Sequence, residues 1–156
     1  MYHRDHGFIP LSMMSDGLRN MVAMIADIAF RCIKLNAHLG REAALKTRGV
    51  VLIDEVDMFL HPSWQQEVIA ALRQAFPLIQ FVITTHSPQV LSTVPSECVR
   101  ILSEGTIYSA PPGNQGAEAS RMLKRIFGVD SRPANDPMTI KLNRYLESVY
   151  KDQWDQ

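Results

Sequence analysis

The sequence predicts an α/β fold in which a mainly parallel β-sheet is flanked by helices. Two short apolar runs, residues 49–53 and 79–84, have the length and composition of strands that are buried on both faces of a parallel sheet. Between them a helical pattern runs from Pro62 to Phe76, and Pro77 marks its end. A strand, a helix and a strand in this order form a right-handed βαβ unit, so we expect the two strands to pair in parallel.

A long helix is predicted before this unit. Ser15 and Asp16 can cap its N-terminus, because their side chains accept hydrogen bonds from the free backbone N–H groups of a first turn. Apolar residues then follow at helical spacing as far as Leu35 and occupy more than one side, so the helix should be covered on more than one face. Residues 1–10 are expected to form an edge strand or a loop.

Shorter elements are predicted after the second strand. Turn residues and short apolar runs predict a short helix at 89–92, a hairpin with strands at 98–102 and 106–109, and helices at 117–127 and 138–150. Gly128 is well placed to end the first of the two longer helices.

The composition excludes several classes of protein. The 156 residues contain 16 Lys and Arg against 16 Asp and Glu, so the chain has no net charge that would attract nucleic acid or an anionic membrane in bulk. The longest apolar stretch, residues 21–33, is interrupted by two charges and falls short of the roughly 20 residues that a bilayer span needs. No signal peptide is visible, so a cytoplasmic protein with no membrane association is expected.

Two carboxylates, Asp54 and Glu55, directly follow the first predicted strand. Parallel α/β sheets place their ligands at the carboxyl ends of strands. In P-loop ATPases an acidic residue at this position holds Mg²⁺, usually through water, and a neighbouring Glu can polarise the attacking water. An ordinary strand that ends in a solvated acidic turn would show the same local pattern.

Two further segments are candidates for binding phosphate. His86 follows the second strand within Thr-Thr-His-Ser-Pro, at the sheet edge expected for Asp54 and Glu55, and it could donate a hydrogen bond to a terminal phosphate. Ser15, Asp16 and Gly17 open the long helix, whose N-terminus is suited to anions, and Gly17 would let the backbone approach a phosphate closely. Taken alone, the first segment also fits a polar turn and the second a plain helix cap.

In this order, the three segments resemble the C-terminal lobe of ABC-type ATPase heads. They read S-D-G-L-R from residue 15, V-V-L-I-D-E-V-D-M-F-L-H-P-S-W-Q-Q from residue 50, and V-I-T-T-H-S-P from residue 82. The resemblance covers residues 7 to 133. It is to the branch that contains RecF, the SMC-like repair heads and the OLD-family ATPases, and within it to bacterial predicted ATP-binding proteins linked to virulence and phage defence.

The resemblance implies a role for each segment. By this resemblance, Ser15, Asp16 and Gly17 match the signature motif, which touches the γ-phosphate held by the opposite subunit. Asp54 matches the Walker B magnesium residue and Glu55 the catalytic base. The D-loop at the dimer seam is matched by Leu60, His61 and Pro62, and the switch histidine by His86. The implied cofactors are ATP and Mg²⁺. The implied partner is a second copy across the nucleotide interface, with DNA or a nuclease as a further partner. Asp57 adds a carboxylate whose role is open, with a solvated position or bracing of the D-loop favoured over binding metal.

One element of such a head is absent from the sequence. No G-x-x-x-x-G-K-[ST] segment occurs, so the loop and lysine that cradle the β- and γ-phosphates are missing. The sequence therefore predicts a partial P-loop NTPase that lacks the N-terminal Walker A lobe. Residues 1–133 would form the C-terminal lobe of the head and residues 134–156 a helical tail. The expected function is one part of an ATP-hydrolysing, nucleotide-driven dimer in DNA-related, defence or virulence processes, and this chain alone should be inactive.

Two alternatives stay open from the sequence. Asp54-Glu55-Val56-Asp57 also fits the D-E-x-D box of nucleic-acid helicases, although these usually carry Ser-Ala-Thr where this chain has Thr-Thr-His. The second alternative is a catalytically silent module that dimerises or binds a partner without turnover.

Overall fold

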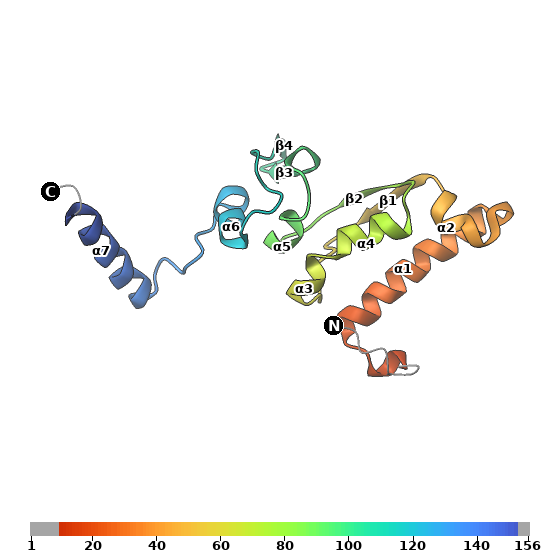
Figure 1. Cartoon of the computed structure of the whole chain (residues 1–156), viewed down its shortest axis with the longest axis horizontal. Coiled ribbons are helices and arrows are strands. Elements are labelled where there is room, and N and C mark those ends of the chain that lie inside the picture. Colours follow the sequence, from red (N-terminus) through yellow and green to blue (C-terminus); the bar gives the residue numbers. More distant parts are fainter. Residues whose placement is uncertain (1–9, 153–156) are drawn as a thin grey trace. The chain divides into compact units, whose positions relative to one another are not determined.

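The computed structural model describes residues 10–152 (Figure 1), so the strand or loop predicted for residues 1–10 lies outside the described residues except for Pro10. Within that range, the residues up to Val94 form one compact unit and those from Pro95 form another. All of the predicted site residues belong to the first unit. The boundary predicted at residue 133 stays a prediction.

The first unit contains the predicted βαβ arrangement. Its elements are the 3₁₀ helices η1 (Leu11–Met13) and η2 (Ala37–Glu42), the helices α1 (Asp16–Leu35), α2 (Ala43–Lys46), α3 (Pro62–Gln65), α4 (Val68–Ala75) and α5 (Pro88–Leu91), and the strands β1 (Gly49–Ile53) and β2 (Ile79–Ile83). The strands pair in parallel, with Gly49 opposite Ile79 and Ile53 opposite Ile83. The predicted strands and their parallel pairing are confirmed.

The helix predicted from Pro62 to Phe76 is divided into α3 and α4. At the division, the N–H of Glu67 donates to the carbonyl of Trp64, three residues back, at 3.0 Å. A bond over three residues tightens the turn, and this interrupts the regular α-helical ladder. The apolar stripe still faces the core, because Val68, Leu72 and Phe76 are almost fully buried.

The core lies on one face of the two-stranded sheet, where α1 and α4 pack together. Two clusters fill it, one around Ile28, Cys32, Ala43 and Phe76 and the other around Val56, Val68, Leu72 and Val90. Alternate strand residues point into these clusters, namely Val51, Ile53, Phe81 and Ile83. This is the period of two that a strand dictates for side chains on one face.

The opposite face of the sheet is open within residues 10–152. Val50 is 62% exposed, Leu52 77% and Val82 49%. The prediction that both faces are buried is therefore wrong for the described part of the chain, because no second layer covers these side chains there. Apolar residues that strands this rich in Val, Leu and Ile normally bury are left facing outward.

α1 has an uncovered apolar side as well. Its N-terminus is capped as predicted, since Ser15 Oγ accepts the N–H of Leu18 at 3.4 Å. Phe30 and Ile33, however, are 61% and 52% exposed. The expectation that α1 is covered on more than one face is not met by the residues that the structure describes.

The second unit contains the predicted hairpin and helices. Its elements are η3 (Ser96–Cys98), β3 (Arg100–Ser103), β4 (Thr106–Ser109), α6 (Ala119–Phe127) and α7 (Pro137–Asp152). The strands β3 and β4 are antiparallel, and Glu104 and Gly105 both have the positive φ that a two-residue hairpin turn requires. Gly128 is left-handed and ends α6, as predicted. None of the helices found between residues 10 and 152 is both long enough and apolar enough to span a membrane.

Candidate active site

The carboxyl end of the parallel sheet brings the acidic segment and the Thr-Thr-His segment together. The ladder between the strands continues beyond their ends, because the N–H of Thr84 donates to Ile53 at 2.9 Å and the N–H of Val56 donates to Thr84 at 3.1 Å. Asp54 and Glu55 therefore lie beside Thr84. The shared sheet edge that was predicted from the strand order is present.

The Thr84 hydroxyl bonds to both members of the acidic pair. Its Oγ1 accepts the backbone N–H of Glu55 at 2.8 Å and donates to Oδ1 of Asp54. The side chain of Asp54 is exposed, and its Oδ2 makes no hydrogen bond to any residue between 10 and 152. Asp54 thus has one oxygen oriented by Thr84 and a second oxygen free to bind a cation or its water ligands.

The backbone of Glu55 is strained. Its φ is 48°, in the left-handed region that costs a residue with a side chain about 1 kcal/mol. Two hydrogen bonds hold it there, one to Thr84 and one from the N–H of Met58 to the Glu55 carbonyl at 2.9 Å. Strain of this kind persists where surrounding contacts fix it, and it often marks functional sites.

His86 lies two residues beyond Thr84, on the turn that leads into α5. Its imidazole is exposed and forms no hydrogen bond within the described part of the chain. Its two neighbours are both anchored. Thr85 Oγ1 donates to Oδ1 of Asp57, and Ser87 is the buried N-cap of α5. Asp57, whose role the sequence left open, therefore has a partner on the histidine turn.

Gly17 is buried against the loop formed by residues 57–60, hereafter the 57–60 loop. A Cβ atom at this position would lie 2.8 Å from the carbonyl carbon of Phe59 and closer still to its oxygen. Close packing of two backbones therefore requires glycine here, whether or not a phosphate is bound. The sequence motif predicted that Gly17 lets a phosphate approach, and it gave no sign of this packing constraint.

The predicted signature and D-loop residues share one surface. Ser15 and His61 both line a hollow of about 170 Å³, together with Gly17, Leu18, Phe59, Leu60 and Trp64. Asp16 forms an ion pair with Arg19 at the surface of α1. His61 caps α3, since its Nδ1 accepts the N–H of Ser63 at 3.3 Å. The two segments that the resemblance assigns to contact with a second subunit thus lie side by side.

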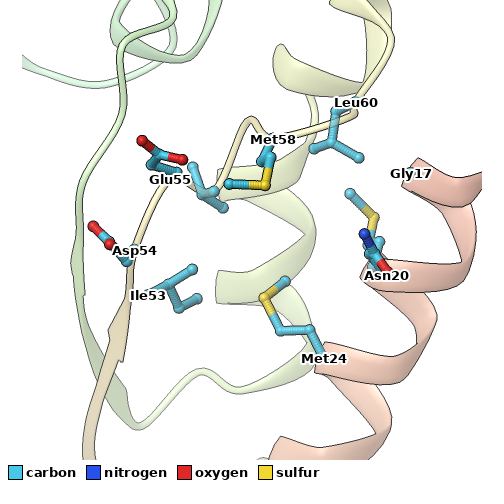
Figure 2. Close-up of a pocket in the computed structure, with 10 residues that line it drawn as sticks. Gly17, Asn20, Met24, Ile53, Asp54, Glu55, Met58 and Leu60 are labelled. Atoms are coloured by element: carbon cyan, nitrogen blue, oxygen red, sulfur yellow. The ribbon is translucent and has the colours of Figure 1, made fainter.

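A second hollow, of about 230 Å³, lies between the start of α1 and the end of β1 (Figure 2). Most of its wall is apolar and comes from Met21, Met24, Ile53, Val56, Met58 and Leu60. Asp54 and Glu55 also border it, but Figure 2 shows their carboxylates on the side away from Met24. The two carboxylates therefore point away from the apolar wall of this cavity, and that of Asp54 lies beside Thr84.

Sequence reasoning missed the polar side chains that support the acidic pair. Thr84, Thr85 and Gln65 each bond to the segment around Asp54 to Leu60. A hydroxyl residue directly after a strand, opposite an acidic strand end, is the signal that could have indicated Thr84. Gln65 gives no comparable signal, because its bonds depend on how the chain folds back.

Comparison with known proteins places these residues in one family. Residues 2–92 match the family described as "AAA domain, putative AbiEii toxin, Type IV TA system". The chain is 41% identical over 152 residues to "Retron Ec83 probable ATPase" from Escherichia coli, which covers 96% of this chain and 28% of that protein. It is 46% identical over 96 residues to "Retron Vc95 probable ATPase" from Vibrio cholerae serotype O1 biovar El Tor, covering 62% of this chain and 18% of that protein.

A third relative carries a different name. The chain is 32% identical over 135 residues to "Septu protein PtuA" from Bacillus mycoides (strain KBAB4), covering 82% of this chain and 18% of that protein. The chain therefore spans less than a third of the length of each of these relatives.

Proposed function

Because the chain belongs to this AAA-domain family of P-loop nucleotide hydrolases, we propose that it supplies the water-activating and trans-acting residues of a dimeric, ABC-type ATPase head. The observation that carries the proposal is that the Thr84 hydroxyl, at the carboxyl end of the parallel sheet, donates to the Asp54 carboxylate and accepts the backbone N–H of Glu55. His86 follows Thr84 by two residues, so the residue types needed for hydrolysis meet at one edge.

Each of the three groups has a task that its environment supports. Asp54 keeps one carboxylate oxygen on Thr84, and the other is free to hold Mg²⁺ through water, in line with the preference of this ion for few protein carboxylates. Bound magnesium would neutralise charge on the phosphates. Glu55 polarises the attacking water, and the exposed His86 donates a hydrogen bond toward the terminal phosphate.

The chain would hold only part of the complete site. It contains no loop and lysine to cradle phosphates, and it spans 28% and 18% of the two retron relatives. The open side of the sheet, with Val50, Leu52 and Val82, is where the rest of the head would pack. We assign the hollow between Ser15 and His61 to the second copy, whose phosphate would lie against the helix N-terminus of α1. By itself the chain would turn over little ATP.

The biological setting is part of the proposal. Relatives are named as retron ATPases and as a Septu protein, and the motifs resemble those of ATPases linked to phage defence. We assign this chain to an ATPase of bacterial defence, in which DNA or a nuclease is the partner on which hydrolysis acts.

Glu55→Gln in the protein at its natural length tests the proposal. The amide cannot act as a base, so steady-state hydrolysis should fall by about 100-fold or more, while the dissociation constant for ATP stays within about twofold. Glu67→Gln is the matched control, because Glu67 is exposed and its side chain makes no hydrogen bond to a described residue. Turnover in Glu55→Gln near that of the control would remove Glu55 from this role.

Ser15→Arg tests the dimer. The long, positively charged arginine side chain would fill the hollow that Ser15 lines, so the second copy could not bind there. ATP should then no longer increase the mass measured by light scattering. Ser12→Arg adds the same charge at an exposed position of η1 and should dimerise normally. Normal dimers in Ser15→Arg would contradict the assignment. Dimers that form with ATP but show no hydrolysis in the unmodified protein would favour the catalytically silent alternative.

A further inference from the structure

Gln65, the last residue of α3, bridges two segments that are far apart in the sequence. Its Nε2 donates to the carbonyl of Leu60 at 3.0 Å and lies 3.4 Å from that of Asp57, so it binds both ends of the 57–60 loop. Its Oε1 accepts the Ser87 hydroxyl at 2.8 Å. One half-buried amide thus joins the 57–60 loop to the turn that carries His86.

A second link joins the same two segments. Thr85 Oγ1 donates to the Asp57 carboxylate and also accepts the N–H of Ser87 at 3.0 Å. The residues on both sides of His86 are therefore tied to the 57–60 loop, Thr85 through Asp57 and Ser87 through Gln65. We use the name histidine latch for these four residues, Asp57, Gln65, Thr85 and Ser87.

The histidine latch holds the backbone on both sides of His86. The imidazole itself is exposed and forms no hydrogen bond within residues 10–152, so the backbone of the turn is what sets the place from which the ring extends. A misplacement of about 1 Å in a catalytic group can lower a rate by about 100-fold. The 57–60 loop also packs on Gly17, so the position of the loop depends on α1. Through the histidine latch, the position of the His86 turn depends on the loop in the same way.

We propose that Gln65 is a positioning residue for hydrolysis, acting through His86. The inference rests on the proposed function, since it takes His86 to contact the terminal phosphate. No motif assigned a role to Gln65. If Gln65 only stabilised the fold, the effect of replacing it would be the same with and without the His86 imidazole. The kcat of variants that have and lack this imidazole therefore distinguishes the two roles.

Gln65→Met in the natural-length protein removes the hydrogen bonds with little change of side-chain volume. The kcat for ATP should fall by about tenfold, while KM and the dissociation constant for ATP stay within about twofold. Gln66→Met is the matched control, since Gln66 is the next residue, is exposed and makes no side-chain hydrogen bond to a described residue. A kcat for Gln65→Met equal to that of Gln66→Met overturns the inference.

The same change in a His86→Ala background separates positioning from stability. If Gln65 acts through the imidazole, Gln65→Met should lower kcat by less than about twofold once the imidazole is gone. A further tenfold loss in that background means that Gln65 acts elsewhere, and it overturns the inference. If Gln65→Met melts several degrees below Gln66→Met, Thr85→Val breaks the other link and is judged by the same two criteria.

The outcome also separates this inference from the proposed function. Normal kcat in Gln65→Met, together with an inactive Glu55→Gln, overturns the latch and leaves the ATPase proposal in place. Normal kcat in His86→Ala contradicts the role of His86 and overturns both that assignment and the latch.

Discussion

Replacing Gly17 with alanine tests the packing of α1 against the 57–60 loop. The new Cβ would meet the backbone of Phe59, with its carbonyl carbon at 2.8 Å. The Phe59 atoms belong to the backbone and cannot rotate away as a side chain would, so α1 or the 57–60 loop must shift. Helix propensity alone would favour alanine over glycine in α1 by up to about 1 kcal/mol. The structure predicts instead that alanine lowers the stability of the fold.

The expected cost follows from these two effects. Forcing an extra methyl group into a closely packed contact costs about 1–3 kcal/mol, and part of this is offset by the helix propensity of alanine. We expect a net loss of about 1–2 kcal/mol, which lowers the melting temperature of a domain of this size by a few degrees. Hydrolysis should fall as well, because the histidine latch ties the turn that carries His86 to the 57–60 loop.

Thermal unfolding of the natural-length protein, followed by fluorescence with and without Mg-ATP, is the assay. Asn20→Ala is the control, because Asn20 is exposed at the rim of the 230 Å³ hollow one turn later, so alanine there changes helix propensity without a clash. Its melting temperature should be unchanged or slightly raised. If Gly17→Ala melts at or above Asn20→Ala, the close approach of the two backbones is wrong. Glycine would then serve only the approach of a phosphate.

Four further outcomes are expected. Thr84→Val should lower kcat by about tenfold or more without weakening ATP binding, because the Asp54 carboxylate and the Glu55 N–H lose the hydroxyl that bonds both. An unchanged kcat in steady-state kinetics would contradict this. Leu72→Ala should cost about 2–5 kcal/mol of stability in denaturant unfolding, since Leu72 is 1% exposed, and a loss below about 1 kcal/mol would place it outside the core. Leu52→Ala should also cost about 2 kcal/mol or more in the natural-length protein, although Leu52 is 77% exposed here; an unchanged stability would mean that nothing packs on that face. Isothermal titration of this chain alone should show binding of Mg-ATP weaker than about micromolar, since the P-loop is missing, and micromolar binding would contradict the missing cradle.

The sheet edge and its acidic pair could be predicted from the sequence. Apolar runs of five or six residues with a helical pattern between them define a βαβ unit, and its strands must end on the same side. The motifs added the resemblance to bacterial ATP-binding proteins, which the family match and the retron relatives confirm. These features depend on local pattern, and local pattern is what a single sequence shows.

Burial on the second sheet face could not be predicted in the same way. Val50 and Leu52 have the composition of a strand between two layers, but whether a layer lies over them depends on other parts of the protein. The predicted burial of Phe30 and Ile33 on a second face of α1 is not met for the same reason, because it also depends on other parts of the protein. The apolar pattern shows only that these side chains are suited to burial. Within residues 10–152, nothing covers them.

The polar contacts at the site also escaped prediction, because they join distant segments. Thr84 bonds to Asp54 across 30 residues and Ser87 to Gln65 across 22. Gly17 is constrained by the backbone of Phe59, which a helix-cap pattern does not reveal. Such contacts are set by the way the chain folds back on itself, so only the structure shows them.

A mixing experiment most directly tests the central claim, that one copy activates the water while the other contributes Ser15. Glu55→Gln and Ser15→Ala variants of the natural-length protein should each be inactive, because every site in either homodimer lacks one essential group. Alanine removes the Ser15 hydroxyl without the bulk that blocks pairing in Ser15→Arg. In a mixed dimer, one of the two sites combines an intact Glu55 with an intact Ser15. Mixing equal amounts should therefore restore up to about a quarter of the wild-type turnover, given random exchange of subunits in a symmetric dimer. A mixture that exchanges subunits, shown by labelled copies, but stays inactive would contradict a site shared between two copies.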